Sequence, residues 1–302
     1  MHIPDGFLAA PVWATLDVAA APAVGYMARR AQRGLEQSQV PLLGVMGAFV
    51  FAAQMINFPV GLGTSGHLVG AALLAYTLGP AAASVVLTAI LAVQALVFQD
   101  GGILSLGANV LNMAVAGVLA GYLPFHLWGS GRWRKHAMFL GGVLSVVVSA
   151  VLALTELLLS GVAMPAAVVR ISLGLFLVSA LLEGAITLAA MQALESIKAD
   201  FVRKPEWNGG RALGWVGMAA VLLAVAGVLV ASTNPDGIWK LAGDIGIASR
   251  AKALVAAPLA DYQMAFLESA WLRKAGAGLA GLCLVYAACL VGGRLLARQK
   301  GV

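Results

Sequence analysis

Apolar residues occur along the chain in blocks of about 20, and short polar segments separate the blocks. A helical block of this length matches the hydrocarbon core of a bilayer, which is about 30 Å thick. The pattern predicts nine spans, at about 8–28, 41–60, 67–80, 81–98, 103–124, 138–160, 169–193, 213–232 and 275–293. The expected fold class is therefore all-α, a polytopic transmembrane helical bundle with about nine spans.

The polar stretch 194–212 is the clearest division of the chain. It contains Pro205 and the pair Gly209-Gly210, and it separates seven spans from two. We therefore expect a seven-span module at 1–200 and a two-span module at 201–302, with a long loop at 233–274 between the last two spans. The third span is short and ends at Gly79-Pro80, and interrupted spans of this kind often form binding sites in transporters.

Composition and charge agree with a membrane protein. Of the 302 residues, 61% are hydrophobic and 11% are charged, whereas soluble domains carry about 25% charged residues. The net charge is +6, but 13 of the 19 basic residues lie in the four segments that nine alternating spans place on one side. The positive-inside rule assigns that side to the cytoplasm. We expect a multi-pass protein of the cell (inner) membrane, in contact with lipid and not nucleic acid, with its N-terminus outside and its C-terminus in the cytoplasm.

The first residues suggest metal chemistry. The opening Met-His-Ile-Pro-Asp-Gly lacks the basic stretch of a secretory signal, so we expect the mature chain to begin at Met1. The Met1 amine, the His2 backbone nitrogen and the His2 Nδ1 can close a five-membered and a six-membered ring around one ion. These three nitrogens lie in one plane, and square-planar nitrogen sites favour Ni²⁺ or Cu²⁺. The alternative is that His2 is an ordinary residue at a frayed terminus.

A fourth nitrogen is available at His67. It follows a glycine-rich segment, residues 61–66, at the predicted outer boundary, on the same side as Met1. The other two histidines, His126 and His136, flank a basic linker on the cytoplasmic side and are expected to be solvated. The turn signature Pro-Asp-Gly at 4–6 can fold the first residues back onto the membrane domain.

Three stretches in order resemble the CbiM/NikM family, the substrate-binding components of energy-coupling factor transporters for cobalt and nickel. They are MHIPDGFL at 1–8, NFPV with GTSGHLVG at 57–70, and QDGG with GANVLNM at 99–113. The resemblance covers about residues 1–200 and implies metal ligation by the Met1 amine, the His2 amide and imidazole, and the His67 imidazole. It also implies a CbiQ/NikQ-like transmembrane coupling subunit and CbiO/NikO-like ATPases as partners, since the chain has no phosphate-binding loop of its own.

The last third resembles the small CbiN/NikN companion, the PDGLE-type domain, fused to the C-terminus. The segments Asn-Pro-Asp-Gly at 234–237 and Pro-Leu-Ala-Asp-Tyr at 258–262 lie between the last two spans. The sequence departs from the family pattern at Ile238 and Trp239, where Leu-Glu is usual. We do not interpret this second Pro-Asp-Gly as a metal site.

Polar residues in or beside the spans are candidates for a shell that orients the ligands. The candidates are Asn57, Ser65, Asp100 and Asn109; helix–helix hydrogen bonding is the alternative role for such residues. Asp17, Glu156 and Glu183 lie inside spans, where acids are functional candidates by default. They are expected either to pair with Arg170 or with amides, or to carry the released cation inward.

Three functions remain open from the sequence. The leading one is the import component, with Ni²⁺ favoured over Co²⁺ because four in-plane nitrogens suit nickel, and with no permanently bound cofactor. The second is an ATP-independent metal permease or channel with the same site. The third is an intramembrane serine protease, since residues 63–66 match the Gly-x-Ser-Gly nucleophile motif, but that chemistry needs a histidine from another span. The chain is therefore not expected to be an enzyme.

Overall fold

The computed structural model describes residues 1–198 and 211–298, and helices make up most of it. The elements, in chain order, are α1 (Ala10–Gln32), α2 (Val40–Gln54), β1 (Phe58–Gly61), β2 (Thr64–Gly66), α3 (Ala71–Leu78), α4 (Pro80–Val93), α5 (Leu106–Asn109), α6 (Val118–Trp128), α7 (Arg134–Leu159), α8 (Ala166–Ile197), α9 (Arg211–Ala226), α10 (Gly237–Asp244) and α11 (Ala270–Arg298). Two π-helical segments, Gln94–Phe98 and Val110–Gly117, extend α4 and join α5 to α6. The all-α class is confirmed.

The predicted count of nine spans is not confirmed. Within the described residues, six helical stretches are long and apolar enough to cross a membrane: 80–98, 106–128, 134–159, 166–197, 211–229 and 270–297. The predicted span at 41–60 is a helix only to Gln54 and then turns into β1. The predicted span at 67–80 contains the eight-residue helix α3. At about 1.5 Å per residue, α3 is about 12 Å long, far short of a bilayer.

The short helix α3 is instead a core element. Its residues Ala71–Thr77 are all buried. Gly70 precedes it with φ of 73°, and a Cβ there would lie 2.5 Å from Val50. Gly79 ends it with φ of 77°, and Pro80 then starts α4 in a new direction. The chain segment that follows His67 is thereby held inside the bundle.

A two-stranded hairpin that the sequence analysis did not anticipate precedes α3. β1 and β2 pair antiparallel, with Phe58 opposite Gly66 and Pro59 opposite Ser65. Leu62 and Gly63 form the two-residue turn with φ of 49° and 69°, which is the positive-φ pair of a type I′ hairpin. The edge of β2 also bridges the C-terminal part of the chain, where Ser65 pairs in parallel with Asp236.

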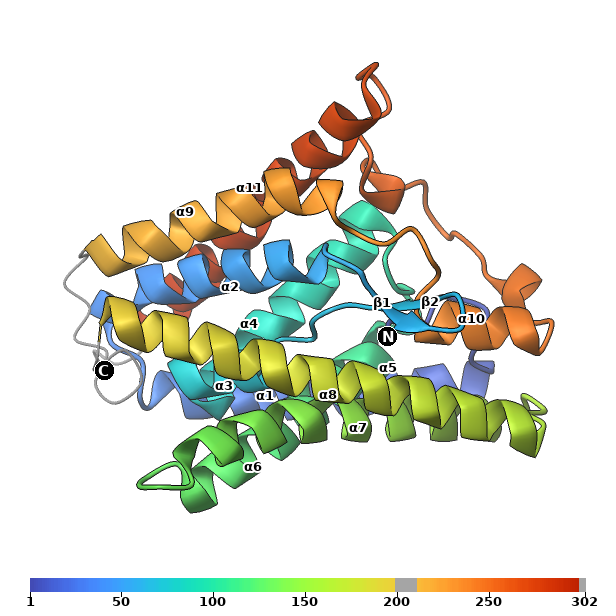
Figure 1. Ribbon diagram of the computed structural model, residues 1–302, viewed down its shortest axis with the longest axis horizontal. Coiled ribbons are helices and arrows are strands. Elements are labelled where there is room, and N and C mark those ends of the chain that lie inside the picture. Colours follow the sequence, from blue (N-terminus) through green and yellow to red (C-terminus); the bar gives the residue numbers. More distant parts are fainter. Residues whose placement is uncertain (199–210, 299–302) are drawn as a thin grey trace.

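The C-terminal helices pack on α2. α2 packs against both α9 and α11, which also contact each other, while α7 packs along α8 (Figure 1). Glycines allow α2 to pack closely on α11, and α7 on α8. A Cβ on Gly47 would lie 2.8 Å from the Cys289 sulfur, and a Cβ on Gly142 would lie 2.7 Å from the Gly184 backbone. The predicted boundary between modules, near residue 200, lies outside the described residues.

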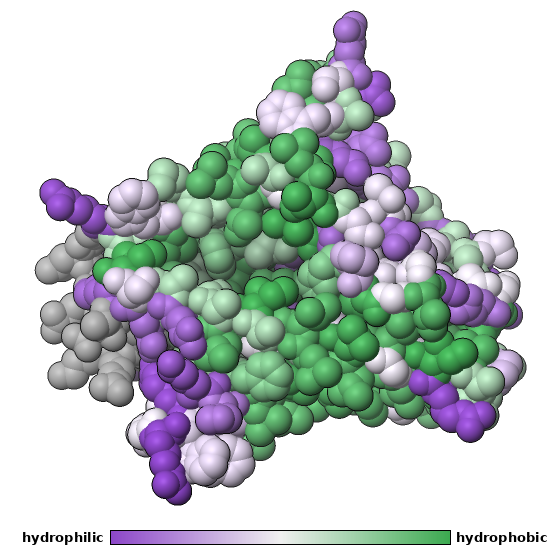
Figure 2. Space-filling model, viewed as in Figure 1, coloured by the Kyte–Doolittle hydropathy of each residue, from purple (hydrophilic) through white to green (hydrophobic). Residues whose placement is uncertain are grey.

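The surface has the pattern of a membrane protein. Figure 2 shows a broad apolar band over the helices, with hydrophilic side chains gathered toward the left and right ends and on the part that projects at the top. The hairpin, α10 and the N-terminus lie toward one end, whereas the end of α8, the start of α9 and the α6–α7 loop lie at the other (Figure 1). His126 and His136, near the α6–α7 loop, are both exposed, as predicted. The chain is therefore a multi-pass membrane protein with polar segments at both ends.

Candidate metal site

The N-terminal segment is buried inside the protein. Met1 has a relative exposure of 9%, His2 of 3% and Ile3 of 0%. Asn109 holds this segment as a neighbouring strand would: its Oδ1 accepts from the Ile3 N–H at 2.8 Å, and its Nδ2 donates to the Ile3 carbonyl at 3.0 Å. Gly102 N–H donates to the same carbonyl at 2.9 Å. His2 is therefore not part of a frayed terminus.

Asp5 anchors the turn that follows. Its carboxylate accepts from the backbone N–H groups of Ile103, Leu104 and Ser105 at 2.9, 2.8 and 3.2 Å. These groups lie just ahead of α5, and such clusters of free N–H groups favour a negative charge. A Cβ on Gly102 would lie 2.1 Å from an Asp5 oxygen, so only glycine fits there. The predicted fold-back of the first residues is thus observed.

His67 lies directly beside the chain start. The Met1 nitrogen is 2.7 Å from His67 Nε2. His67 Nδ1 donates to the Leu68 carbonyl at 2.9 Å, which leaves the lone pair of Nε2 facing the amine. Burial, the charged amine and His2 lower the pKa of His67 to about 3. The imidazole is therefore neutral and able to act as a ligand.

Glu183 fixes the segment after His67. Its two carboxylate oxygens accept from the N–H groups of Val69 and Gly70 at 2.7 and 2.8 Å. The other acids inside helices also bind amides: Asp17 accepts from Gly107 N–H, and Glu156 accepts from the side chain of Asn112. All three acids therefore pair with amides, as one of the two expected roles requires.

His2 is buried without a well-directed hydrogen bond. Neither ring nitrogen has a partner of good geometry, although Nδ1 lies 3.1 Å from Asp100 Oδ1. The His2 and His67 rings are nearly parallel, with 5° between their planes and 5.2 Å between their centroids. Burying an imidazole whose nitrogens form no hydrogen bond costs free energy. A bound metal ion would offset this cost, so the His2 ring is suited to act as a metal ligand.

Asp100 connects His2 to the C-terminal part of the chain. Its Oδ2 accepts from the Tyr262 hydroxyl at 2.6 Å. Burial would raise the pKa of Asp100, but the His2 and His67 rings and the Tyr262 hydroxyl outweigh this effect and hold it below its usual range. Asp100 is therefore a carboxylate.

Asp236 lies beside the candidate site, although the sequence analysis did not assign it there. Its Oδ2 lies 2.8 Å from the Met1 ammonium, and its Oδ1 caps α10 by accepting from Trp239 N–H. Burial raises the pKa of Asp236, but the Met1 ammonium and His67 together lower it by a larger amount, so its pKa is below the usual value. The signal was present in the sequence, because residues 235–237 repeat the Pro-Asp-Gly of residues 4–6.

The other predicted supporting residues divide into two groups. Asp100 and Asn109 contact the N-terminal segment directly, as described above. Ser65 lines the same small cavity as Met1 and His67, but its hydroxyl donates to the Asn234 carbonyl at 2.7 Å. Asn57 lies at the start of the hairpin, where its own carbonyl accepts from Ser232 N–H. Ser65 and Asn57 therefore hold the C-terminal loop onto the hairpin.

A family comparison decides what kind of protein carries this site. The model of the CbiM family, described as "Cobalt uptake substrate-specific transmembrane region", matches residues 2–201. The chain belongs to the CbiM family. The match ends before α9, so the C-terminal helices and the loop that carries Asp236 lie outside it.

Other relatives extend the family similarity into this C-terminal part. A putative fused nickel transport protein NikMN of Archaeoglobus fulgidus is 35% identical over 243 residues, which is 78% of this chain and 80% of the relative. The fused nickel transport protein NikMN of Rhodobacter capsulatus is 28% identical and covers 100% of both chains. A crystal structure of a truncated transition metal transporter has a TM-score of 0.58 and 33% identity, over 65% of this chain and 99% of that one.

These findings make the chain a cobalt or nickel transport component of the CbiM/NikM family, with a CbiN/NikN-like C-terminal part. It is not an enzyme, because its relatives are transport proteins. The serine protease interpretation also lacks its geometry, since the Ser65 hydroxyl is bound to a carbonyl and His67 belongs to the same segment.

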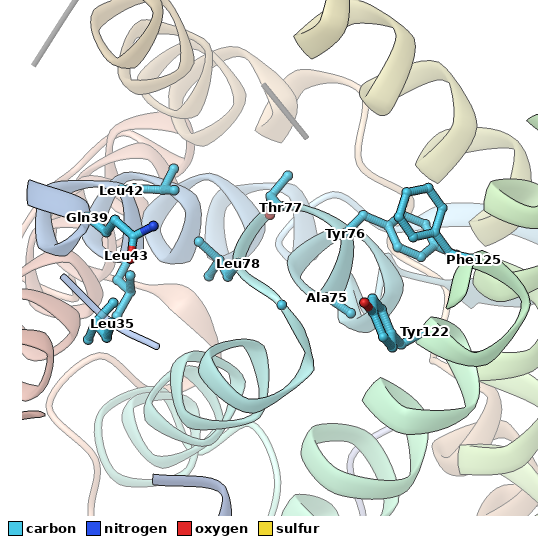
Figure 3. Close-up of a pocket in the computed structure, with 11 residues that line it drawn as sticks. Leu35, Gln39, Leu42, Leu43, Ala75, Tyr76, Thr77, Leu78, Tyr122 and Phe125 are labelled. Carbon is cyan, nitrogen blue, oxygen red and sulfur yellow. The ribbon is translucent and has the colours of Figure 1, made fainter. Parts of the chain in front are cut away.

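A second cavity lies at the far end of α3. It has a volume of about 240 Å³ and is lined by Leu35, Gln39, Leu42, Leu43, Ala75, Tyr76, Thr77, Leu78, Gly79, Tyr122 and Phe125 (Figure 3). These residues offer no His, Cys, Asp or Glu side chain. Nor does any group of three or more such side chains converge on one point in the part of the chain that the structure describes.

Proposed function

We propose that this CbiM protein captures Ni²⁺ or Co²⁺ as the substrate-binding component of an ATP-driven energy-coupling factor importer. The ligands are the Met1 amine, the His2 amide nitrogen, the His2 imidazole and the His67 imidazole. The observation that carries the proposal is the 2.7 Å distance between the Met1 nitrogen and His67 Nε2. Two nitrogens that bind one ion at right angles, each about 2.0 Å away, lie about 2.8 Å apart. The amine and His67 are thus already spaced as neighbouring corners of a square.

The charges of the site suit a divalent ion. Without metal, the site contains the terminal ammonium and the carboxylates of Asp100 and Asp236. Binding requires the amine and the His2 amide each to lose one proton, while His67 is already neutral. A divalent ion that replaces two protons leaves the net charge of the buried site unchanged. This exchange avoids the cost of adding charge to a region of low dielectric constant.

Nickel is the preferred ion within this proposal. Four nitrogens in one plane are a geometry that favours Ni²⁺, since square-planar coordination suits its electronic structure. The fused relatives named above are nickel transport proteins, which supports the same choice. Cobalt remains the alternative that direct titration distinguishes.

The distribution of basic residues supports the proposed orientation in the membrane, and the lack of a phosphate-binding loop in this chain supports the proposed ATPase partners. The end with the N-terminus faces outside and the basic linkers face the cytoplasm, so the site lies on the extracellular side of the protein. The chain has no phosphate-binding loop, so energy comes from cytoplasmic ATPase subunits joined to it by a transmembrane coupling subunit. The competing proposal, an ATP-independent permease, predicts full uptake by this chain alone.

Isothermal titration of the purified protein with Ni²⁺, Co²⁺ and Mg²⁺ tests the site. We expect tight binding of Ni²⁺, weaker binding of Co²⁺ and no binding of Mg²⁺. His67→Ala should weaken Ni²⁺ binding more than about 100-fold, since even an outer-shell residue costs up to about 100-fold. The exposed His126 provides the control, and His126→Ala should bind as wild type does. Retained affinity in His67→Ala would remove His67 from the ligand set.

A further inference from the structure

Tyr262 lies far from the metal-binding module in sequence but touches its site. It belongs to the loop between α10 and α11, outside residues 2–201 that match the CbiM model. Its hydroxyl donates to Asp100 Oδ2 at 2.6 Å, and the other oxygen of that carboxylate lies 3.1 Å from His2 Nδ1. One phenol group therefore determines how Asp100 faces the His2 imidazole.

The same hydroxyl joins a second chain of hydrogen bonds. Gln94 Nε2 donates to it at 3.3 Å and to Gln54 Oε1 at 2.8 Å. Gln54 Nε2 in turn donates to the Val69 carbonyl at 2.8 Å, two residues beyond His67. Tyr262 is thus the point at which the His2 side and the His67 side of the site are linked.

The loop adopts a strained backbone to deliver this hydroxyl. Asp261 and Tyr262 have φ of 53° and 56°, in the left-handed region that L-residues other than glycine rarely adopt. Such conformations persist where surrounding contacts fix them, and they concentrate at functional sites. The Tyr262 ring is stacked on Phe98 with centroids 4.6 Å apart, and Leu259 N–H donates to the Val97 carbonyl at 3.0 Å.

The π-helical segment at the end of α4 contacts the loop that carries Tyr262. Gln94 opens the π-helical segment that ends α4, and Gln99 follows it with φ of 57° before Asp100. π-helical turns occur frequently at functional sites. The Gln94 and Asp100 side chains both reach the Tyr262 hydroxyl from this irregular stretch.

We propose that Tyr262 is a positioning residue of the metal site, which holds the Asp100 carboxylate beside His2 Nδ1, so that a negative charge lies next to the bound cation. This inference rests on the proposed function. It makes the affinity of the site depend on the C-terminal module, although Tyr262 supplies none of the four ligands. The hydroxyl acts on the site only through the position of the Asp100 carboxylate.

Tyr262→Phe tests the proposal, because it keeps the ring on Phe98 and removes only the hydroxyl. Groups that orient metal ligands typically contribute about 10–100-fold in affinity, so the Kd for Ni²⁺ should rise by about that factor. The matched control is Tyr286→Phe on α11, where the ring lies against Gly44, and its Kd should equal that of wild type. The visible absorption of bound Ni²⁺ should also change in Tyr262→Phe and not in the control.

A double-mutant cycle shows whether the effect passes through Asp100. Asp100→Asn and the pair Asp100→Asn with Tyr262→Phe should bind with similar Kd, because residues in one network are not additive. Thermal unfolding of the metal-free proteins sets a temperature at which all variants are folded for these titrations. A Tyr262→Phe Kd within twofold of wild type, or fully additive effects in the cycle, overturns the inference. A wild-type protein that binds neither Ni²⁺ nor Co²⁺ refutes the proposed function instead.

Discussion

Replacing Asn109 by leucine should release the N-terminal segment from the site. The change keeps the size of the side chain but removes both hydrogen bonds to the Ile3 peptide. The Ile3 carbonyl keeps its bond from Gly102, whereas the buried Ile3 N–H loses its acceptor. An orphaned buried N–H costs about 1–3 kcal/mol, and the second bond contributes about 0.5–1.5 kcal/mol. The combined cost is about 2–4 kcal/mol.

This cost should appear in metal affinity, because binding needs Met1 and His2 in place. A binding-competent state that is less populated raises the apparent Kd by the same factor. At about 1.4 kcal/mol per tenfold, the Kd for Ni²⁺ should rise by about 30–1,000-fold. Isothermal titration measures it, with thermal unfolding of the metal-free protein to show that the bundle remains folded.

Asn57→Leu provides the matched control. The contact that Asn57 makes with Ser232 uses the main chain of Asn57, so the substitution leaves it intact. The binding free energy should change by well under about 1 kcal/mol, and the Kd for Ni²⁺ should stay within about twofold of wild type. A folded Asn109→Leu protein with an unchanged Kd would refute the reasoning, since it would mean that metal binding does not require the observed position of Ile3.

Two further predictions concern the chelate itself. Acetylating the Met1 amine keeps every side chain but removes one proposed ligand nitrogen, so tight Ni²⁺ binding should be lost in titration; a wild-type Kd would mean that the amine is not a ligand. Binding should also weaken as the pH falls, because the amine and the His2 amide must each release a proton, whereas His67, with its pKa lowered to about 3, releases none. Where the amine is charged, two released protons correspond to about 100-fold in Kd per pH unit, and titration in buffers of different ionisation heat counts them. A count below two would mean that the amine and the His2 amide are not both ligands.

The lengths of the helices could be predicted only in part from the apolar pattern. The long blocks at 81–98, 138–160 and 169–193 correspond to helices of spanning length, because a block of about 20 apolar residues has few other stable locations. The blocks at 41–60 and 67–80 are equally apolar, yet they contain a strand and an eight-residue buried helix. Apolar composition cannot distinguish a segment in contact with lipid from one surrounded by other helices, since both environments exclude charge.

The sequence by itself predicted the three residues of the proposed metal site, Met1, His2 and His67. Met1 and His2 are joined by short bonds, and the side on which His67 lies follows from the distribution of basic residues. Only the tertiary structure decided that Asp236 and Tyr262 reach the same site, because each lies more than 150 residues from its partner, at sequence separations of 235 and 162. Local patterns fix what neighbouring residues can do together, whereas contacts across such distances depend on how α2, α9 and α11 pack, which no pattern within one segment specifies.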